Sequence, residues 1–265
     1  TNIKMNKYLR VANKYKKEVK IMDKVKYYVF FGDSITEGVG VNIGERYFDR
    51  ISQKLGVKTA GYGVNGAQSV HVPEQIAKMQ AEHKADEIGK IFVLIGTNDF
   101  ANSVPIGEFF TESVEAIPTL YDENGNFARS ELRKKRSFIF DKNTFCGRLN
   151  IIFEKLKKDY PFADIIIMTP LHRAYAYFGG DNIQPDELYA NGAGRYFDEY
   201  VQTVRKCADV WSLKLIDLYR ESGLYPLGDG NAALYFCSDK TDRLHPNANG
   251  HARIAETIMQ SVKLD

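Results

Sequence analysis

Short apolar runs separated by amphipathic segments set the pattern of hydrophobic and polar positions along the chain. The runs that suit strands cover residues 28–31, 57–62, 88–95, 163–168 and 213–218. The third, IGKIFVLI, is apolar enough to be covered on both faces, as strands of a parallel sheet are. The pattern therefore predicts five strands.

The segments between these runs have helical spacing. Tyr47, Phe48, Ile51 and Leu55 repeat at that spacing, and Gly56 suits the position after a helix end. The predicted helices cover residues 46–55, 70–83, 143–159, 194–211 and 248–262. Because strands and helices alternate, the predicted fold class is α/β, a layered structure in a single domain over residues 1–265.

The amino-terminal extension, residues 1 to about 25, is lysine-rich and has too few apolar residues for a buried strand. A lead-in helix over about residues 8–19 is predicted. The extension has no apolar region of the kind that defines a signal peptide. The chain begins with Thr rather than Met, which leaves export open.

The regular pattern lapses over residues 100–141, and an insertion is predicted at about residues 104–140. Residues 121–127 suit a polar turn, and residues 133–136 form the basic run Arg-Lys-Lys-Arg. Two interpretations stay open for this region. It is either an exposed surface excursion with a solvated basic face or a lid that selects the substrate.

Composition excludes several classes of protein. The formal net charge of +2 gives no global field for nucleic acid or an anionic membrane. No apolar run approaches the roughly 18 residues of a membrane span. The three cysteines, Cys146, Cys207 and Cys237, are far apart and form neither a disulfide framework nor a CxxC motif.

Small polar clusters follow three of the predicted strands. Gly32-Asp33-Ser34 ends the first, a loop containing Gly66 follows the second, and Asn98 follows the third. The carboxyl ends of parallel strands meet at one edge of a sheet, where ligands bind. Ser34 is a candidate nucleophile there, although each cluster alone also suits an ordinary turn.

Two further stretches offer polar side chains. Asp242 and His245, three residues apart on a turn, can pair so that the imidazole faces outward as a base, with Asp239 as a second choice for the acid. The loop after the fourth strand carries candidate substrate contacts at the pocket mouth, and its glycine pair could let it move. These candidates are His172, Arg173, Tyr175 and Tyr177.

Taken together, these residues resemble the SGNH (GDSL-type) hydrolase family. The family pattern is a Gly-Asp-Ser block, a glycine in a second block, Gly-x-Asn-Asp in a third and Asp-x-x-His near the carboxyl terminus. Here these blocks are 32–34, Gly66, 96–99 and 242–245, and they occur in that order over about four fifths of the chain. Each block is weak alone, but their conjunction is specific.

The resemblance implies a flavodoxin-like, three-layer α/β/α sandwich with five parallel strands in the order 2-1-3-4-5. It also implies an oxyanion hole formed by the N–H groups of Ser34 and Gly66 and the side chain of Asn98. Ser34 would attack an ester carbonyl, His245 would take its proton, and Asp242 would orient the imidazole. Neither a metal nor an organic cofactor is needed.

The expected substrate is a small-molecule or carbohydrate ester, with a short acyl group such as acetate on a polar alcohol. Tyrosine-rich loops and the lack of a long apolar tract favour it. Lysophospholipase, thioesterase and acyltransferase activities share this machinery, and a non-catalytic binding module on the same fold is a further alternative. A hydrolase of external polysaccharide would be exported, which favours a secreted or periplasmic location. The sequence does not indicate an oligomeric state.

Overall fold

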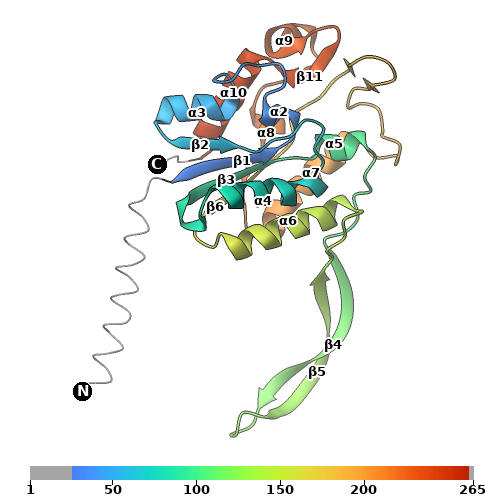
Figure 1. Cartoon of the computed structure of the whole chain (residues 1–265). Helices are drawn as coiled ribbons and strands as arrows, with labels where there is room; N and C mark the ends of the chain where they lie inside the picture. The colour runs from blue at the N-terminus through green and yellow to red at the C-terminus, as the bar shows by residue number, and fades with distance from the viewer. Residues whose placement is uncertain (1–25, 263–265) are drawn as a thin grey trace, which may run out of the picture.

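The computed structural model describes residues 26–262 and has a five-stranded parallel sheet at its centre (Figure 1). Its strands are β1 (Tyr27–Gly32), β2 (Lys58–Gly61), β3 (Ile88–Leu94), β6 (Asp164–Met168) and β9 (Lys214–Ile216). They lie in the order β2-β1-β3-β6-β9, and every neighbouring pair is parallel. The predicted strand order is confirmed.

Helices cover both faces of this sheet. Side chains alternate along β1, so that Val29 and Phe31 enter one apolar cluster while Tyr28 and Phe30 enter the other. The first cluster packs under α4 (Val72–Glu82), α6 (Phe145–Asp159) and α7 (Phe197–Trp211). The second packs under α3 (Tyr47–Leu55) and α10 (Ala248–Ser261). The predicted three-layer sandwich is therefore confirmed.

Within residues 100–141, where the sequence predicts no strand or helix, the structure has regular secondary structure. The chain forms a long antiparallel hairpin of β4 (Phe110–Tyr121) and β5 (Phe127–Phe138), which projects away from the layers (Figure 1). Its base is held by the Asn150 side chain, which donates to the carbonyls of Phe109 and Ile139. Every residue of β5 and most residues of β4 are exposed, so neither face of the hairpin leaves a clear apolar pattern in the sequence.

A second, small antiparallel sheet in the order β10-β11-β7-β8 was not predicted. Its strands have two to five residues, too few for a clear pattern. They are β7 (Ala176–Tyr177), β8 (Ile183–Gln184), β10 (Phe236–Ser238) and β11 (Asp242–Pro246). The remaining short elements are α2 (Ser34–Glu37), η1 (Ser69–His71), η2 (Ala85–Glu87), α5 (Thr97–Ala101), α8 (Leu218–Glu221) and α9 (Asp229–Tyr235).

The helix expected over residues 8–19 lies outside the described residues. Over residues 26–262, no helix combines the length and the apolar character that a membrane span requires.

Candidate active site

The turn between β1 and α2 places Ser34 at the carboxyl edge of the sheet. A Cβ on Gly32 would lie 2.2 Å from Thr36 Oγ1 and 2.7 Å from Leu94 O, so only glycine fits there. The Gln75 side chain from α4 brackets the Gly32 backbone, accepting from its N–H at 3.0 Å and donating to its carbonyl at 2.7 Å. These contacts fix the end of β1 from which Ser34 begins α2.

The structure brings Ser34 together with His245 and Asp242. His245 Nε2 lies 3.0 Å from Ser34 Oγ, and His245 Nδ1 lies 3.0 Å from Asp242 Oδ2. Both distances are those of hydrogen bonds. When Nδ1 carries the proton and donates to the carboxylate, Nε2 is free to accept the serine proton. The second choice, Asp239, only offers its carbonyl, to Arg243.

The carboxylate of Asp242 is also held by backbone. Its Oδ1 accepts from the N–H groups of Leu244 and His245, at 3.2 and 3.0 Å. One aspartate therefore orients both the strand β11 and the imidazole that the strand carries. The ring of Phe178 lies 5.3 Å from that of His245, centroid to centroid, and covers it from the side of the 169–196 loop.

Asp33 lies next to Ser34 but has a different task. Its carboxylate accepts from the Ile35 N–H at 3.0 Å and so caps the turn. Burial raises its pKa from 3.8 to about 6, although the Ile35 hydrogen bond and the nearby His245 act in the opposite direction. The carboxylate holds the turn, and among the described residues no hydrogen bond joins it to the imidazole.

The two other expected oxyanion donors lie on neighbouring connections that are tied to each other. Gly66 has φ of +73°, a left-handed conformation that favours glycine. The loop around it joins the serine turn, because Val64 N–H donates to Gly32 O at 3.2 Å. The Asn98 side chain donates to Ala67 O at 3.0 Å, which leaves its second amide proton for a ligand.

A buried carboxylate locks this arrangement. Asp99 accepts from the Ser69 N–H at 2.9 Å and from Ser69 Oγ at 2.6 Å, and Arg148 of α6 donates to it at 2.9 Å. Burial raises the Asp99 pKa, while the hydrogen bonds from Ser69 and Arg148 lower it. Sequence reasoning missed Arg148 and Gln75, because their partners lie 49 and 43 residues away.

The four predicted substrate contacts have unlike positions. Tyr175 and Tyr177 are 40% and 42% exposed and remain available to a ligand. His172 instead pairs with Glu187 at 2.6 Å and stacks on Tyr219 at 3.6 Å, centroid to centroid. Together these contacts pin the loop to α8.

Arg173 was predicted at the pocket mouth, and the structure buries it to 1% exposure. Its guanidinium donates to Thr97 O at 3.0 Å and to Gln184 Oε1 at 2.7 Å, so it points inward and ties the loop to α5. Phe178, which contacts His245, was missed. The only signal for it was its place at the end of the run Tyr-Ala-Tyr-Phe at residues 175–178.

The loop also supports the strand that carries the imidazole. Ala176 of β7 pairs with Asp242 of β11, and Ala174 N–H donates to Arg243 O at 3.2 Å. The small sheet therefore fixes the dyad relative to the loop.

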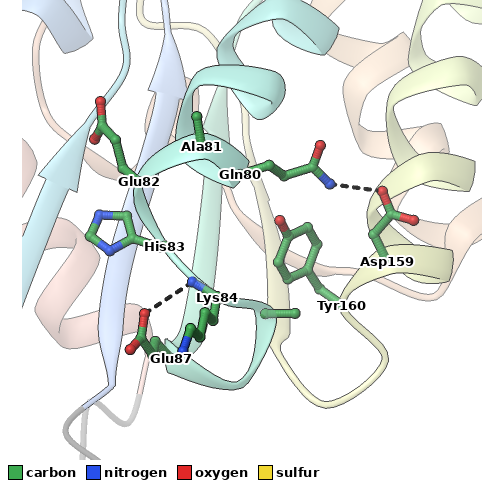
Figure 2. Close-up of a pocket in the computed structure, with 9 residues that line it drawn as sticks. Gln80, Ala81, Glu82, His83, Lys84, Glu87, Asp159 and Tyr160 are labelled. Carbon is green, nitrogen blue, oxygen red and sulfur yellow. Dashed lines mark hydrogen bonds between the residues drawn. The ribbon is translucent and has the colours of Figure 1, made fainter.

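A cavity of about 730 Å³ lies elsewhere, and Figure 2 shows the residues that line it. It is bounded by the ends of α4 and α6 and by η2, where Gln80 donates to Asp159 at 3.0 Å. These segments precede β3 and β6, at the amino edge of the sheet, so the cavity is separate from the candidate site. Among the described residues, no group of three or more His, Cys, Asp or Glu side chains could hold a metal ion.

A hydroxyl, an imidazole and a carboxylate in hydrogen-bonded sequence form the arrangement by which serine hydrolases activate a nucleophile. The chain belongs to the GDSL-like lipase/acylhydrolase family, whose sequence model matches residues 30–253. The resemblance seen in the four sequence blocks is confirmed, and the class of protein is that of the acyl hydrolases.

Solved structures share this fold at low sequence identity. A protein from Lactobacillus plantarum is 22% identical, with a TM-score of 0.65 over 89% of this chain and 96% of that one. A member of the lipolytic protein G-D-S-L family from Veillonella parvula is 16% identical, with a TM-score of 0.55 over 91% and 100%. An acetyl xylan esterase is 18% identical, with a TM-score of 0.55 over 89% and 99%. No curated protein matches the sequence significantly.

Proposed function

We propose that this protein is a serine esterase that hydrolyses carboxylic esters through an acyl-enzyme on Ser34. The observation that carries the proposal is the pair of 3.0 Å contacts that join Ser34 Oγ to His245 Nε2 and His245 Nδ1 to Asp242. A serine hydroxyl is a weak nucleophile on its own and needs an adjacent base that is itself held by a third group.

In acylation, Ser34 Oγ attacks the ester carbonyl while its proton passes to His245 Nε2. The imidazolium that forms is stabilised by Asp242, which keeps its own charge. His245 then gives the proton to the leaving alcohol. In deacylation, His245 activates a water molecule that attacks the acyl-enzyme, and the proton returns to Ser34.

The negative charge that develops on the carbonyl oxygen requires fixed donors. The Ser34 N–H, the Gly66 N–H and the free amide proton of Asn98 supply them in this proposal. The contact of Asn98 with Ala67 and the Asp99–Ser69 clamp support it, because both hold the two connections in one geometry before substrate arrives. Such preorganised donors are usually the largest single contribution to this chemistry.

The substrate we propose is a short-acyl ester, such as an acetate, on a carbohydrate or similar polar alcohol. Tyr175, Tyr177 and Phe178 are each about 40% exposed on the loop beside the imidazole, and aromatic rings with one wet face suit the faces of sugars. The packing of Phe178 against His245 narrows the space beside the ester. The acetyl xylan esterase of the same fold supports the assignment only by analogy.

A panel of esters tests this proposal. Nitrophenyl acetate and butyrate should be cleaved faster than the decanoate, and acetylated sugars should release acetate, while phospholipids and acyl thioesters should react slowly. A preference for acyl chains of about ten carbons would contradict the short-acyl assignment. Failure to cleave any ester would contradict the esterase itself.

A further inference from the structure

The guanidinium of Arg173 is a buried cation without an anionic partner. Its Nε makes no hydrogen bond, and its other nitrogens donate to neutral oxygens of Thr97 and Gln184. Among residues 26–262, no carboxylate comes within ion-pairing distance of it. Buried charges in proteins are normally paired, since an unpaired one is strongly unfavourable.

The nearby acid Glu187 does not fill this role. Its two oxygens are taken by the His172 ring, the Tyr219 hydroxyl and the backbone N–H of Arg173. Burial lowers the Arg173 pKa to about 10, with the charges of Glu187 and Asp33 acting against that fall. The guanidinium therefore keeps its proton at neutral pH.

A cavity of about 180 Å³ opens beside this group. It is lined by Arg173, by Phe100 of α5, and by Ile183, Gln184 and Tyr189 of the loop. The guanidinium of Arg173 contacts two other residues that line the cavity. Arg173 Cζ lies 5.3 Å from the Phe100 ring centroid, and the guanidinium donates to Gln184 Oε1.

The cavity adjoins the candidate active site. Thr97, which accepts from Arg173, is followed directly by Asn98, and Arg173 is followed by Ala174, whose N–H bonds to the strand that carries the imidazole. The charge of Asp33, the neighbour of Ser34, also acts on Arg173. These links place the cavity beside the elements that carry Asn98 and His245.

We propose that this cavity binds a carboxylate group of the substrate, with Arg173 as the residue that determines specificity. The inference rests on the proposed esterase function and adds the charge of the preferred substrate to it. A guanidinium offers parallel N–H donors to a carboxylate, and the apolar rings of Phe100 and Tyr189 suit the carbon atoms next to it. The carboxylate belongs either to the acyl group or to the alcohol.

Matched esters distinguish these two sources. Mono-nitrophenyl succinate compared with its methyl ester places the charge on the acyl side, and O-acetyl lactate compared with methyl O-acetyl lactate places it on the alcohol side. We expect kcat/KM to favour the charged member by about 10- to 100-fold in one of the two pairs, as a charge-assisted hydrogen bond would give. Arg173→Gln should bring that ratio to about one.

Two further measurements cover the case in which Arg173→Gln does not fold. Ile183→Glu places a carboxylate at the cavity wall and should reduce the ratio, whereas Ile183→Gln should preserve it. Free succinate should raise the unfolding temperature of the unsubstituted protein more than succinamide does, and this readout does not depend on catalysis.

The outcomes separate this inference from the proposed function. Hydrolysis of nitrophenyl acetate without any preference for a charged ester, and without stabilisation by succinate, would overturn the carboxylate site and leave the esterase intact. Absence of all ester hydrolysis would overturn the esterase, and stabilisation by succinate would then still support the cavity as a carboxylate site.

Discussion

Two connections that leave the carboxyl edge of the sheet are built in opposite ways. The hairpin β4–β5 interrupts the path from β3 to α6, and the 169–196 loop interrupts the path from β6 to α7. Both are rich in polar and aromatic residues. The two strands of the hairpin pair with each other along their length, whereas the loop bonds to β11, α5 and α8.

The difference lies in what each segment holds in place. The loop uses a buried Arg173, a buried Glu187 and backbone pairing with Asp242, and so fixes the surroundings of His245. Within the described residues, the hairpin is held at its base, where Asn150 donates to Phe109 O and Phe138 contacts Trp211. A two-stranded hairpin with both faces in water gains little stability from packing.

This contrast indicates where specificity is encoded. The hairpin projects away from the layers (Figure 1), and the loop places an aromatic ring against the imidazole. We expect substitutions in the loop to change catalysis and substantial changes in the hairpin to leave the chemistry intact.

The largest expected effect is a loss of activity on substitution of Asn98. This residue lies in the same connection as the hairpin, between β3 and β4. Asn98→Ala should lower kcat by about 10²–10³-fold, because one oxyanion donor is lost. Asn102→Ala is the matched control on the next turn, since the Asn102 side chain only donates to the Asn98 carbonyl. Equal losses in both variants would show that the effect is structural.

A second effect concerns α10, in the helical layer behind the site, and makes the stability of the protein depend on pH. His251 of α10 is fully buried, and burial lowers its pKa from 6.5 to about 4, with help from the nearby Arg50. Between these values the unfolded chain binds more protons than the folded one, so stability falls as pH drops from 6.5 towards 4. From pH 7 to pH 5 this loss is about 2 kcal/mol.

The variant His251→Gln removes this titration. Urea unfolding at pH 7 and pH 5 should show a loss in the unsubstituted protein that exceeds the loss in the variant by that amount. Asp33 has the opposite sign, because its raised pKa makes the folded state bind more protons between 3.8 and about 6. Its contribution is common to both proteins and cancels in the difference, so identical pH profiles would contradict this account of His251.

A smaller effect is expected within the loop. Phe178→Ala removes the ring beside His245, and kcat/KM for nitrophenyl acetate should fall by about threefold to tenfold, the range of a lost aromatic contact. Tyr189→Ala, on the same loop and 64% exposed, serves as the control and should change this neutral substrate less. No change in Phe178→Ala would mean that the ring is not part of the site.

The smallest effect should follow removal of the hairpin. Thr111 and Ser137 are cross-strand partners, so an Asn-Gly turn between them can replace residues 112–136. Activity on nitrophenyl acetate should stay within about twofold, since no described contact joins the removed residues to Ser34 or His245. A tenfold loss would show that the hairpin supports the site and would remove the contrast between the two connections.

Much of the fold was predictable because buried strands leave apolar runs and covering helices leave a helical repeat. The sequence blocks also led to the contact of Ser34 with His245 and Asp242, since strand ends meet at one edge. The hairpin was not predictable as a hairpin, because a strand exposed on both faces has no apolar side. Its basic run suggested only a solvated surface.

The supporting residues were hidden for a different reason. Gln75, Arg148 and Arg173 are polar side chains that act through partners 43 to 76 residues away, and no local pattern announces such contacts. Arginine in particular is expected at the surface. Only the folded chain shows that Arg173 lies inside.

Labelling by an organophosphonate probe tests the central claim most directly, because the probe reacts only with a serine that a neighbouring base has activated. We predict a single adduct on the peptide that contains Ser34, none in Ser34→Ala, and far slower labelling in His245→Gln. A folded, unsubstituted protein that resists the probe, or that is labelled equally well after Ser34→Ala, would contradict the assignment of Ser34 as the nucleophile.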